Sequence, residues 1–160
     1  MKSLLSPALL LATASLALAA PAAKHAMPAK PAKTSPPAVQ ATIMVTDAWF
    51  RSLPGTLPAG GYFTAKNIVP RDVAITGAKS DACGMLMLHR SSDKGGMSGM
   101  DMVTKVEIPA GGTLSFAPAG YHLMCENPKM KIGAKVPVVL TLSDGTSVAV
   151  PFVVRNARGK

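Results

Sequence analysis

Short β-prone runs, each broken by Gly, Pro, Asn or Asp, fill the chain from Thr42 onward. Turn residues recur roughly every eight to twelve positions, a spacing that is typical of an all-β sandwich or barrel. Asp144-Gly145 separates the last two runs and is a strong hairpin signal. No long amphipathic helix and no internal repeat interrupts this pattern. We therefore predict about eight to nine short strands, with candidates at 43–49, 61–68, 73–79, 85–89, 103–108, 113–116, 121–125, 136–143 and 146–154.

The N-terminal segment has a different character. Lys2 precedes a Leu- and Ala-rich run over residues 4–18, and Ala17-Leu18-Ala19 offers a small-x-small cleavage pattern. This predicts a signal peptide at 1–20 and export to the periplasm. A membrane anchor is the weaker interpretation, because a span needs about 20 apolar residues. Residues 21–41 are rich in Pro, Ala and Lys and predict a disordered linker.

Charge argues against a nucleic-acid partner. The formal net charge of the chain is +9, but residues 42–154 hold ten Lys or Arg and eight Asp or Glu, which is about +2. The excess lies in the two end segments, including a basic tail at 155–160. We expect residues 42–154 to form a monomeric domain with no nucleic-acid partner and no membrane span after cleavage of the signal peptide.

Methionine is the unusual component of the composition. The chain contains ten, and Met97, Met100 and Met102 lie among Gly, Ser, Asp and Lys rather than in an apolar run. The same part of the chain contains four soft donors, His89, Met100, His122 and Met124. Two imidazoles and two thioethers form a neutral donor set that suits Cu(I) far better than hard cations.

A strand would give these donors a common direction. In a strand over 121–125, His122 and Met124 point to the same face, because side chains alternate. His89 would arrive from the end of a neighbouring strand, and Met100 from a flexible Gly-rich loop. A surface histidine or a chance His-x-Met remains the alternative, and it would leave a β-sandwich interaction module without metal. His25 and Met27 repeat the pattern in the linker, either by chance or as an auxiliary copper-capture site.

The two cysteines, Cys83 and Cys125, leave three possibilities open. In an oxidising compartment they could form a disulfide, remain as buried thiols, or supply a sulfur near the copper. A blue-copper centre is disfavoured, because such a centre needs two His with a Cys thiolate and no His follows Cys125. We expect no enzyme activity, since the chain has no Gly-x-Ser-x-Gly, no His-Glu-x-x-His and no carboxylate pair near a His.

The spacing His89–x10–Met100–x21–His122–x–Met124 resembles that of the PCu(A)C family of periplasmic copper chaperones. The flanking text is similar too, in VTDAWFRSLP, GGYFTAKN, IPAGGTLSFAPAGYHLM and VPVVLTLSDGTSVAVPFVV. The resemblance covers roughly residues 42–154. It implies a cupredoxin-like β-sandwich that binds one Cu(I) through those four residues.

The resemblance also implies what happens to the copper. The family is associated with delivery to the CuA centre in subunit II of cytochrome c oxidase, directly or with Sco-type thiol proteins. A copper sink for detoxification is the alternative, because it would use the same site with other partners. The chain departs from the family in two ways. Arg90 follows His89 where a Met is common, and Met97 and Met102 flank Met100, which leaves the identity of the third donor less certain. Some members bind a second copper in a C-terminal extension rich in His and Met; because VVRNARGK holds neither residue, we expect no second site of that kind.

Overall fold

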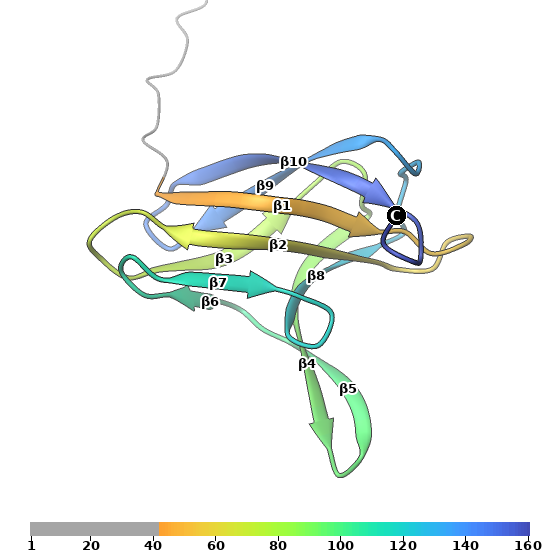
Figure 1. The fold of residues 1–160 in the computed structure, drawn as a ribbon, viewed down its shortest axis with the longest axis horizontal. Helices are drawn as coiled ribbons and strands as arrows, with labels where there is room; N and C mark the ends of the chain where they lie inside the picture. The colour runs from red at the N-terminus through yellow and green to blue at the C-terminus, as the bar shows by residue number, and fades with distance from the viewer. Residues whose placement is uncertain (1–41) are drawn as a thin grey trace, which may run out of the picture. The chain divides into compact units, whose positions relative to one another are not determined.

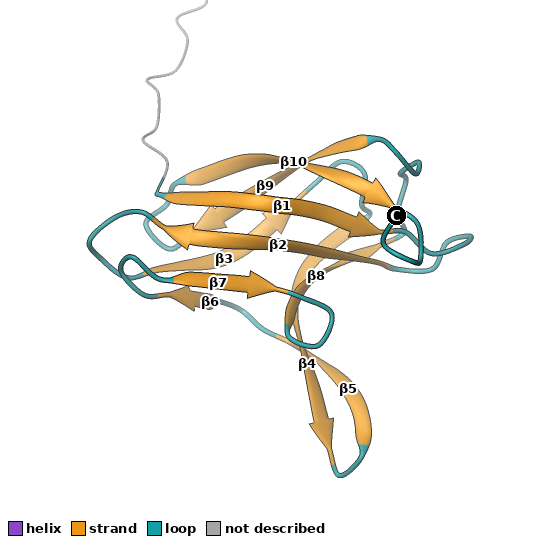
Figure 2. Ribbon diagram, in the orientation of Figure 1, coloured by secondary structure: helices purple, strands orange, loops and turns teal. Residues whose placement is uncertain are grey.

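The computed structural model describes residues 42–160. The expected signal peptide, the linker and the His25/Met27 pair lie outside the described residues. Within 42–160 every regular element is a strand, as Figure 2 shows, and no helix is long and apolar enough to cross a membrane.

Ten strands follow one another along the chain. They are β1 (Ile43–Arg51), β2 (Ala59–Asn67), β3 (Val73–Lys79), β4 (Met85–Lys94), β5 (Met97–Met102), β6 (Val106–Ile108), β7 (Thr113–Phe116), β8 (Tyr121–Glu126), β9 (Lys135–Leu142) and β10 (Ser147–Arg155). The predicted all-β class is confirmed. The predicted strand number was too low by at least one, because β5 lies in the segment that the sequence analysis treated as a flexible loop.

All ten strands belong to one mixed sheet that curls over itself (Figure 1). The order is β5-β4-β8-β2-β1-β10-β9-β3-β6, with β7 paired to β2. Only the β1–β10 pairing is parallel among the described strands. The fold is the cupredoxin-like β-sandwich that the resemblance implied, and β8 is placed between β4 and β2.

The core follows from strict alternation. In β9, KVPVVLTL buries every second residue: Val136, Val138, Leu140 and Leu142 face inward, and the residues between them, Val139 included, face solvent. Aromatic rings close the centre of the core: Phe63 stacks on Phe116 with 4.1 Å between centroids, and Phe152 packs on Phe50 at 5.0 Å. This packed centre gives β2 and β8 a rigid support.

The hairpin of β4 and β5 projects from the rest of the sheet (Figure 1). Its two-residue turn is Gly95-Gly96, and both glycines have positive φ, at 66° and 82°. Such a turn matches the right-handed twist of the flanking strands. The Asp93 carboxylate accepts a hydrogen bond from the Gly96 amide at 3.1 Å and closes the turn. The Gly-rich segment is therefore an ordered hairpin because its glycines form a turn.

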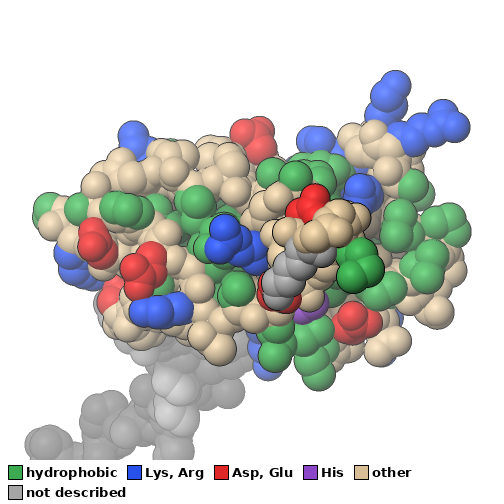
Figure 3. Space-filling model, turned by 90° about the horizontal axis from the view of Figure 1, so that it is seen from below, with side chains coloured by type: hydrophobic (Ala, Val, Ile, Leu, Met, Phe, Trp, Pro, Cys, Tyr) green, Lys and Arg blue, Asp and Glu red, His purple; other side chains and the backbone are tan. Residues whose placement is uncertain are grey.

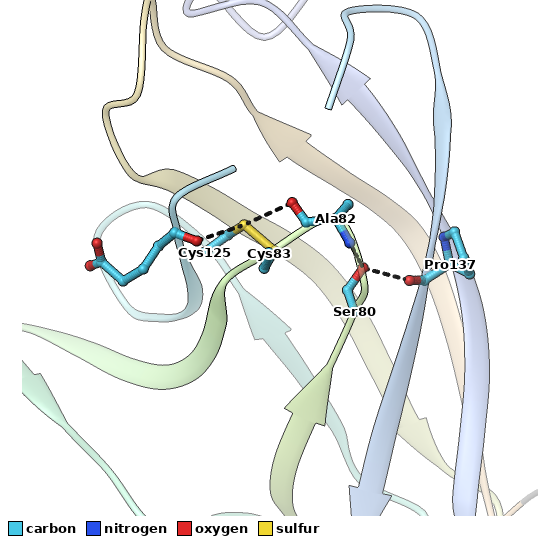
Figure 4. Close-up of a disulfide and its surroundings, with 6 residues drawn as sticks. Ser80, Ala82, Cys83, Cys125 and Pro137 are labelled. Carbon is cyan, nitrogen blue, oxygen red and sulfur yellow. Dashed lines mark hydrogen bonds between the residues drawn. A yellow bond between two sulfur atoms is a disulfide. The ribbon is translucent and has the colours of Figure 1, made fainter. Parts of the chain in front are cut away.

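A disulfide between Cys83 and Cys125 joins β8 to the loop before β4. The Cys125 side chain is fully buried, and Cys125 lies opposite Leu86 across the β8–β4 pairing. Close by, the Ser80 hydroxyl donates a hydrogen bond to the Pro137 carbonyl at 2.7 Å (Figure 4). Of the three possibilities that the sequence left open for the cysteines, the structure shows the disulfide.

Residues 156–160 form a turn after β10. The Asn156 amide donates to the Lys160 carbonyl at 2.8 Å, and the Gly159 amide donates to the Asn156 carbonyl at 2.9 Å. The Arg155 guanidinium lies 4.9 Å from the centre of the Trp49 ring. The basic end of the chain is thus held against β1.

Candidate metal centre

The central strand of the candidate site is β8. His122 lies directly opposite His89 on β4, and Met124 lies opposite Met87 on β4 and Gly60 on β2. His122 and Met124 are two positions apart on one strand, so they share a face, as the sequence predicted. Opposite residues also share a face, so His89 joins them there. Pairing of β4 with β8 therefore brings three of the four predicted donors together.

The two imidazoles are close neighbours. Their ring centroids are 5.9 Å apart and the rings meet edge to face. His122 is only 4 % exposed, and its Nδ1 lies 3.1 Å from the carbonyl oxygen of Gly120. A carbonyl only accepts hydrogen bonds, so Nδ1 carries the proton and Nε2 keeps its lone pair. A backbone contact of this kind orients a metal-binding histidine and sets its tautomer.

His89 differs from His122 in its hydrogen bonding. Its Nδ1 is buried and has no hydrogen-bond partner among residues 42–160. A buried polar atom without a partner is costly and calls for an explanation, such as an ion that the atom binds. Burial lowers the pKa of His89 below the ordinary 6.5, and electrostatic interaction with the neighbouring His122 lowers this pKa further. His89 is thus kept neutral, which is the state that binds metal.

A cavity of about 240 Å³ opens beside His122. Met100 and Met124 line it together with His122, and Tyr62, Gly60 and Arg51 complete part of its wall. The Tyr62 ring lies 6.4 Å from that of His122. A Cβ at Gly60 would come within 2.5 Å of the Tyr62 hydroxyl, so a larger residue here would displace the Tyr62 side chain from the cavity wall. Two thioethers and one imidazole therefore converge on one cavity.

The β4–β5 register shows which face of the hairpin each methionine of β5 occupies. Met102 lies opposite His89, and Met100 lies opposite Ser91, so both share the face of His89. Met97 lies opposite Lys94 and so belongs to the other face. Met100 is 59 % exposed despite lining the cavity. The hairpin thus brings Met100 to the site, places Met102 beside His89 and turns Met97 away.

Met87 is a residue of this face that sequence reasoning missed. It is half-buried and lies directly opposite Met124. The alternation Met85, Met87, His89 within one strand was the signal that could have revealed it. Seen from the hairpin side, a histidine reaches the surface between hydrophobic side chains, a class that includes methionine (Figure 3).

The chemistry of this face is soft and neutral. In the described part of the chain, no three His, Cys, Asp or Glu side chains gather as a metal cluster. The donors that do gather are imidazole nitrogen and thioether sulfur. Such a set can hold a soft cation without neutralising its charge. The Cys125 sulfur is buried in its disulfide, and Cys125 lies on the opposite face of β8 from Met124.

Comparison with known proteins agrees with this geometry. Residues 43–154 match the family described as "Putative lipoprotein LpqE-like". The chain is 32% identical over 133 residues to the putative lipoprotein Lxx21020 of Leifsonia xyli subsp. xyli, covering 81% of this chain and 80% of that one.

Solved structures of similar proteins are PCuAC domains and related proteins. The apo form of DR1885 from Deinococcus radiodurans is 31% identical, with a TM-score of 0.55 over 83% of this chain and 96% of that one. The Cu(I) form of DR1885 is also 31% identical, and it gives a TM-score of 0.56 over 68% of this chain and 74% of that one. The copper-bound PCuAC domain of PmoF2 shares the fold at a TM-score of 0.61 and 20% identity, over 72% of this chain and 94% of that domain. The folded part of the chain therefore has the fold of PCuAC domains, and the chain belongs to the LpqE-like family.

Proposed function

We propose that this protein is a periplasmic copper chaperone that binds one Cu(I) through His89, His122, Met124 and Met100. The observation that carries this proposal is the convergence of Met100, His122 and Met124 on one cavity, with the unpartnered Nδ1 of His89 on the neighbouring strand. Cu(I) is the cargo of the protein, and the reaction is transfer without catalysis.

Neutral donors suit a carrier. Four neutral ligands leave the full positive charge of Cu(I) in place, and the Arg51 guanidinium adds a second positive charge at the cavity wall. A thiolate-bearing acceptor is attracted to this charge. Its sulfur replaces the protein's ligands on copper one at a time, beginning with the exposed Met100. The domain thereby holds copper in transit and releases it to softer, anionic ligands.

The similar proteins support the proposals that this protein binds copper and that it is exported. A copper-bound structure of the PmoF2 domain and a Cu(I) form of DR1885 are among the similar proteins. The N-terminal signal sequence and the lipoprotein names of the relatives support an exported, envelope-associated protein. We propose the CuA centre in subunit II of cytochrome c oxidase as the destination, reached directly or with Sco-type proteins.

A Cu(I) competition assay with a colorimetric chelator tests the binding step. The parent chain should take up one tightly bound equivalent, and Met124→Leu should weaken its affinity at least about tenfold, because leucine keeps the size and removes the sulfur. Met97→Leu is the matched control, since Met97 lies on the other face of the hairpin. Equal losses in the two variants would sink the assignment of ligands.

A transfer assay separates the chaperone from a copper sink, which would share the site. The Cu(I)-loaded chain is mixed with the copper-free CuA domain of subunit II, with and without a reduced Sco-type protein. A chaperone loses its copper to the acceptor under at least one of these conditions. Copper that stays on the chain in both would favour a role in sequestration.

A further inference from the structure

A second pair of thioethers lies on the same face as the proposed copper site. Met87 and Met102 both line a separate cavity of about 300 Å³, which lies between β3, β4 and the segment after β5. The remaining lining residues are Thr, Gly, Ala, Leu and Val, with no charged side chain. We call Met87 and Met102 the outer pair, and Met100 and Met124 the inner pair.

The strand register places the outer pair around His89. Met102 lies directly opposite His89, and Met87 precedes His89 by two residues on the same face. Opposite side chains have Cβ atoms about 4.5–5.5 Å apart, and diagonal neighbours about 7–8 Å apart, within reach of long side chains. Both sulfurs can therefore approach the His89 ring.

Packing does not account for the outer pair. Met102 is 68% exposed, so its side chain buries little apolar surface. Met87 is half-buried, and it lies directly opposite Met124 of the inner pair. The Nδ1 of His89 has no hydrogen-bond partner in residues 42–160. This nitrogen is therefore available to bind a metal next to either methionine pair. An exposed thioether, a half-buried thioether and an unpartnered imidazole thus occupy neighbouring positions on one face of the sheet.

We propose that Met87, His89 and Met102 form a second Cu(I) site, which shares His89 with the first site. The inference rests on the proposed copper function and deepens it. One ion moves between the two donor sets by stepwise ligand exchange: copper–sulfur bonds to Met87 and Met102 form as the bonds to Met124, Met100 and His122 break, and the bond to His89 is kept. Copper stays Cu(I) throughout, and no electron or proton is transferred. The exposed Met102 makes this second site the solvent-facing one.

The test is a Cu(I) competition series on the whole chain. All proteins carry His25→Ala and Met27→Leu, so that the N-terminal pair cannot bind the metal. The first variant replaces the inner pair by leucine. The second replaces both pairs by leucine. Met97→Leu, added to the first variant, is the control, because Met97 is exposed on the opposite face of the hairpin.

The inner-pair variant should keep one equivalent of Cu(I) at reduced affinity. Replacing the outer pair as well should weaken that residual binding by at least a further factor of about ten, because two thioethers are lost. The Met97→Leu control should leave it unchanged. Residual binding that is indifferent to the outer pair, or no binding after loss of the inner pair, would overturn the second site. Absence of binding to the parent chain would instead overturn the proposed function.

Methyl NMR of the unmutated chain gives a second readout that does not depend on folding of the variants. With 13C-methyl methionine, addition of Cu(I) should shift the signals of Met87 and Met102 as well as those of the inner pair. The signals of Met97 and Met44 should stay in place. Shifts confined to the inner pair would contradict the exchange between two sites.

Discussion

At the scale of single residues, the two histidines differ in how their protons are controlled. The Gly120 carbonyl fixes the proton of His122 on Nδ1 and leaves Nε2 free. His89 has no such partner within 42–160, and burial is what keeps it neutral. The backbone therefore orients the imidazole of His122. The environment of His89 disfavours a proton on its imidazole but leaves the ring able to bind a soft metal ion.

Protonation of these histidines predicts the pH dependence of copper binding. A protonated imidazole must lose its proton before it binds copper. For each such imidazole, the affinity falls about tenfold for every pH unit below its pKa. The pKa of His89 is lowered, so its contribution begins only below the ordinary value of about 6.5. Chelator competition from pH 8 to 5 should show affinity falling at the acidic end. Constant affinity over this range would contradict ligation by two histidines.

The same pKa shift affects the stability of the metal-free protein. A His whose pKa is lower when folded binds a proton more readily when unfolded. Its contribution is therefore complete above the unfolded value of about 6.5 and decreases as the pH falls through it. Urea unfolding at pH 7.5 and 5.5 should show a smaller acid loss in His89→Gln than in the parent. An equal loss in both would remove His89 as the cause.

At the scale of elements, the β4–β5 hairpin positions both Met100 and Met102. Every residue of β5 is exposed, whereas β4 contains the buried Leu88. The turn glycines have positive φ, a conformation that costs about 1–2 kcal/mol for a residue with a Cβ. The conformation of this turn therefore governs how well the thioethers of β5 are presented.

Replacing Gly95 and Gly96 together by alanine tests this role. No heavy atom lies within 4 Å of a Cβ at either position, so the change adds backbone strain without a steric clash. We expect weaker Cu(I) affinity in chelator competition and little change in the thermal midpoint of the domain. Gly99→Ala is the control in the same hairpin: its φ is ordinary, and the nearest atom is the Ser92 hydroxyl at 3.3 Å. A loss of affinity as large in the control would refute the importance of the turn.

Most elements were predictable from local pattern, and the exceptions have physical reasons. β9 and β10 alternate between buried and exposed residues, so their positions and the Asp144-Gly145 turn were evident. β5 was missed because MSGMDM is exposed on both faces and has no period of two. Gly95-Gly96 was its only local signal, since a Gly-Gly pair is a known hairpin turn.

The candidate site was predictable only as far as each strand determines it. The common face of His122 and Met124 followed from alternation along β8. The pairing of His89 with His122, and of Met87 with Met124, depends on the register between distant strands. That register is set by the whole core, so neither the role of Met87 nor the disulfide could be read from the sequence. Ligation by the four donors stays a prediction.

At the scale of the whole molecule, the disulfide supports the sheet from the side opposite the donors. It closes a loop of 42 residues in sequence separation that contains β4 to β7 and most of β8. Loop-closure entropy for such a length amounts to about 4 kcal/mol of stability. The cross-link therefore secures β4 against β8, the two strands that hold the histidines.

Replacing both cysteines by alanine separates stability from copper binding. The free energy of unfolding, measured by denaturant titration, should fall by about 4 kcal/mol. The Cu(I) affinity of the folded variant, measured below its unfolding transition, should stay close to that of the parent, because Cys125 lies on the other face of β8 from Met124. A large loss of affinity in the folded variant would mean that sulfur from the cysteines takes part in binding.

X-ray absorption of the Cu(I)-loaded chain tests the central claim most directly, because it reports the atoms bound to the metal. The account predicts imidazole nitrogen and thioether sulfur together around Cu(I), with the sulfur contribution reduced in the variant that replaces both methionine pairs, Met100 and Met124 together with Met87 and Met102, by leucine. A copper site with nitrogen and oxygen neighbours alone, or one whose sulfur contribution is unchanged in that variant, would contradict it.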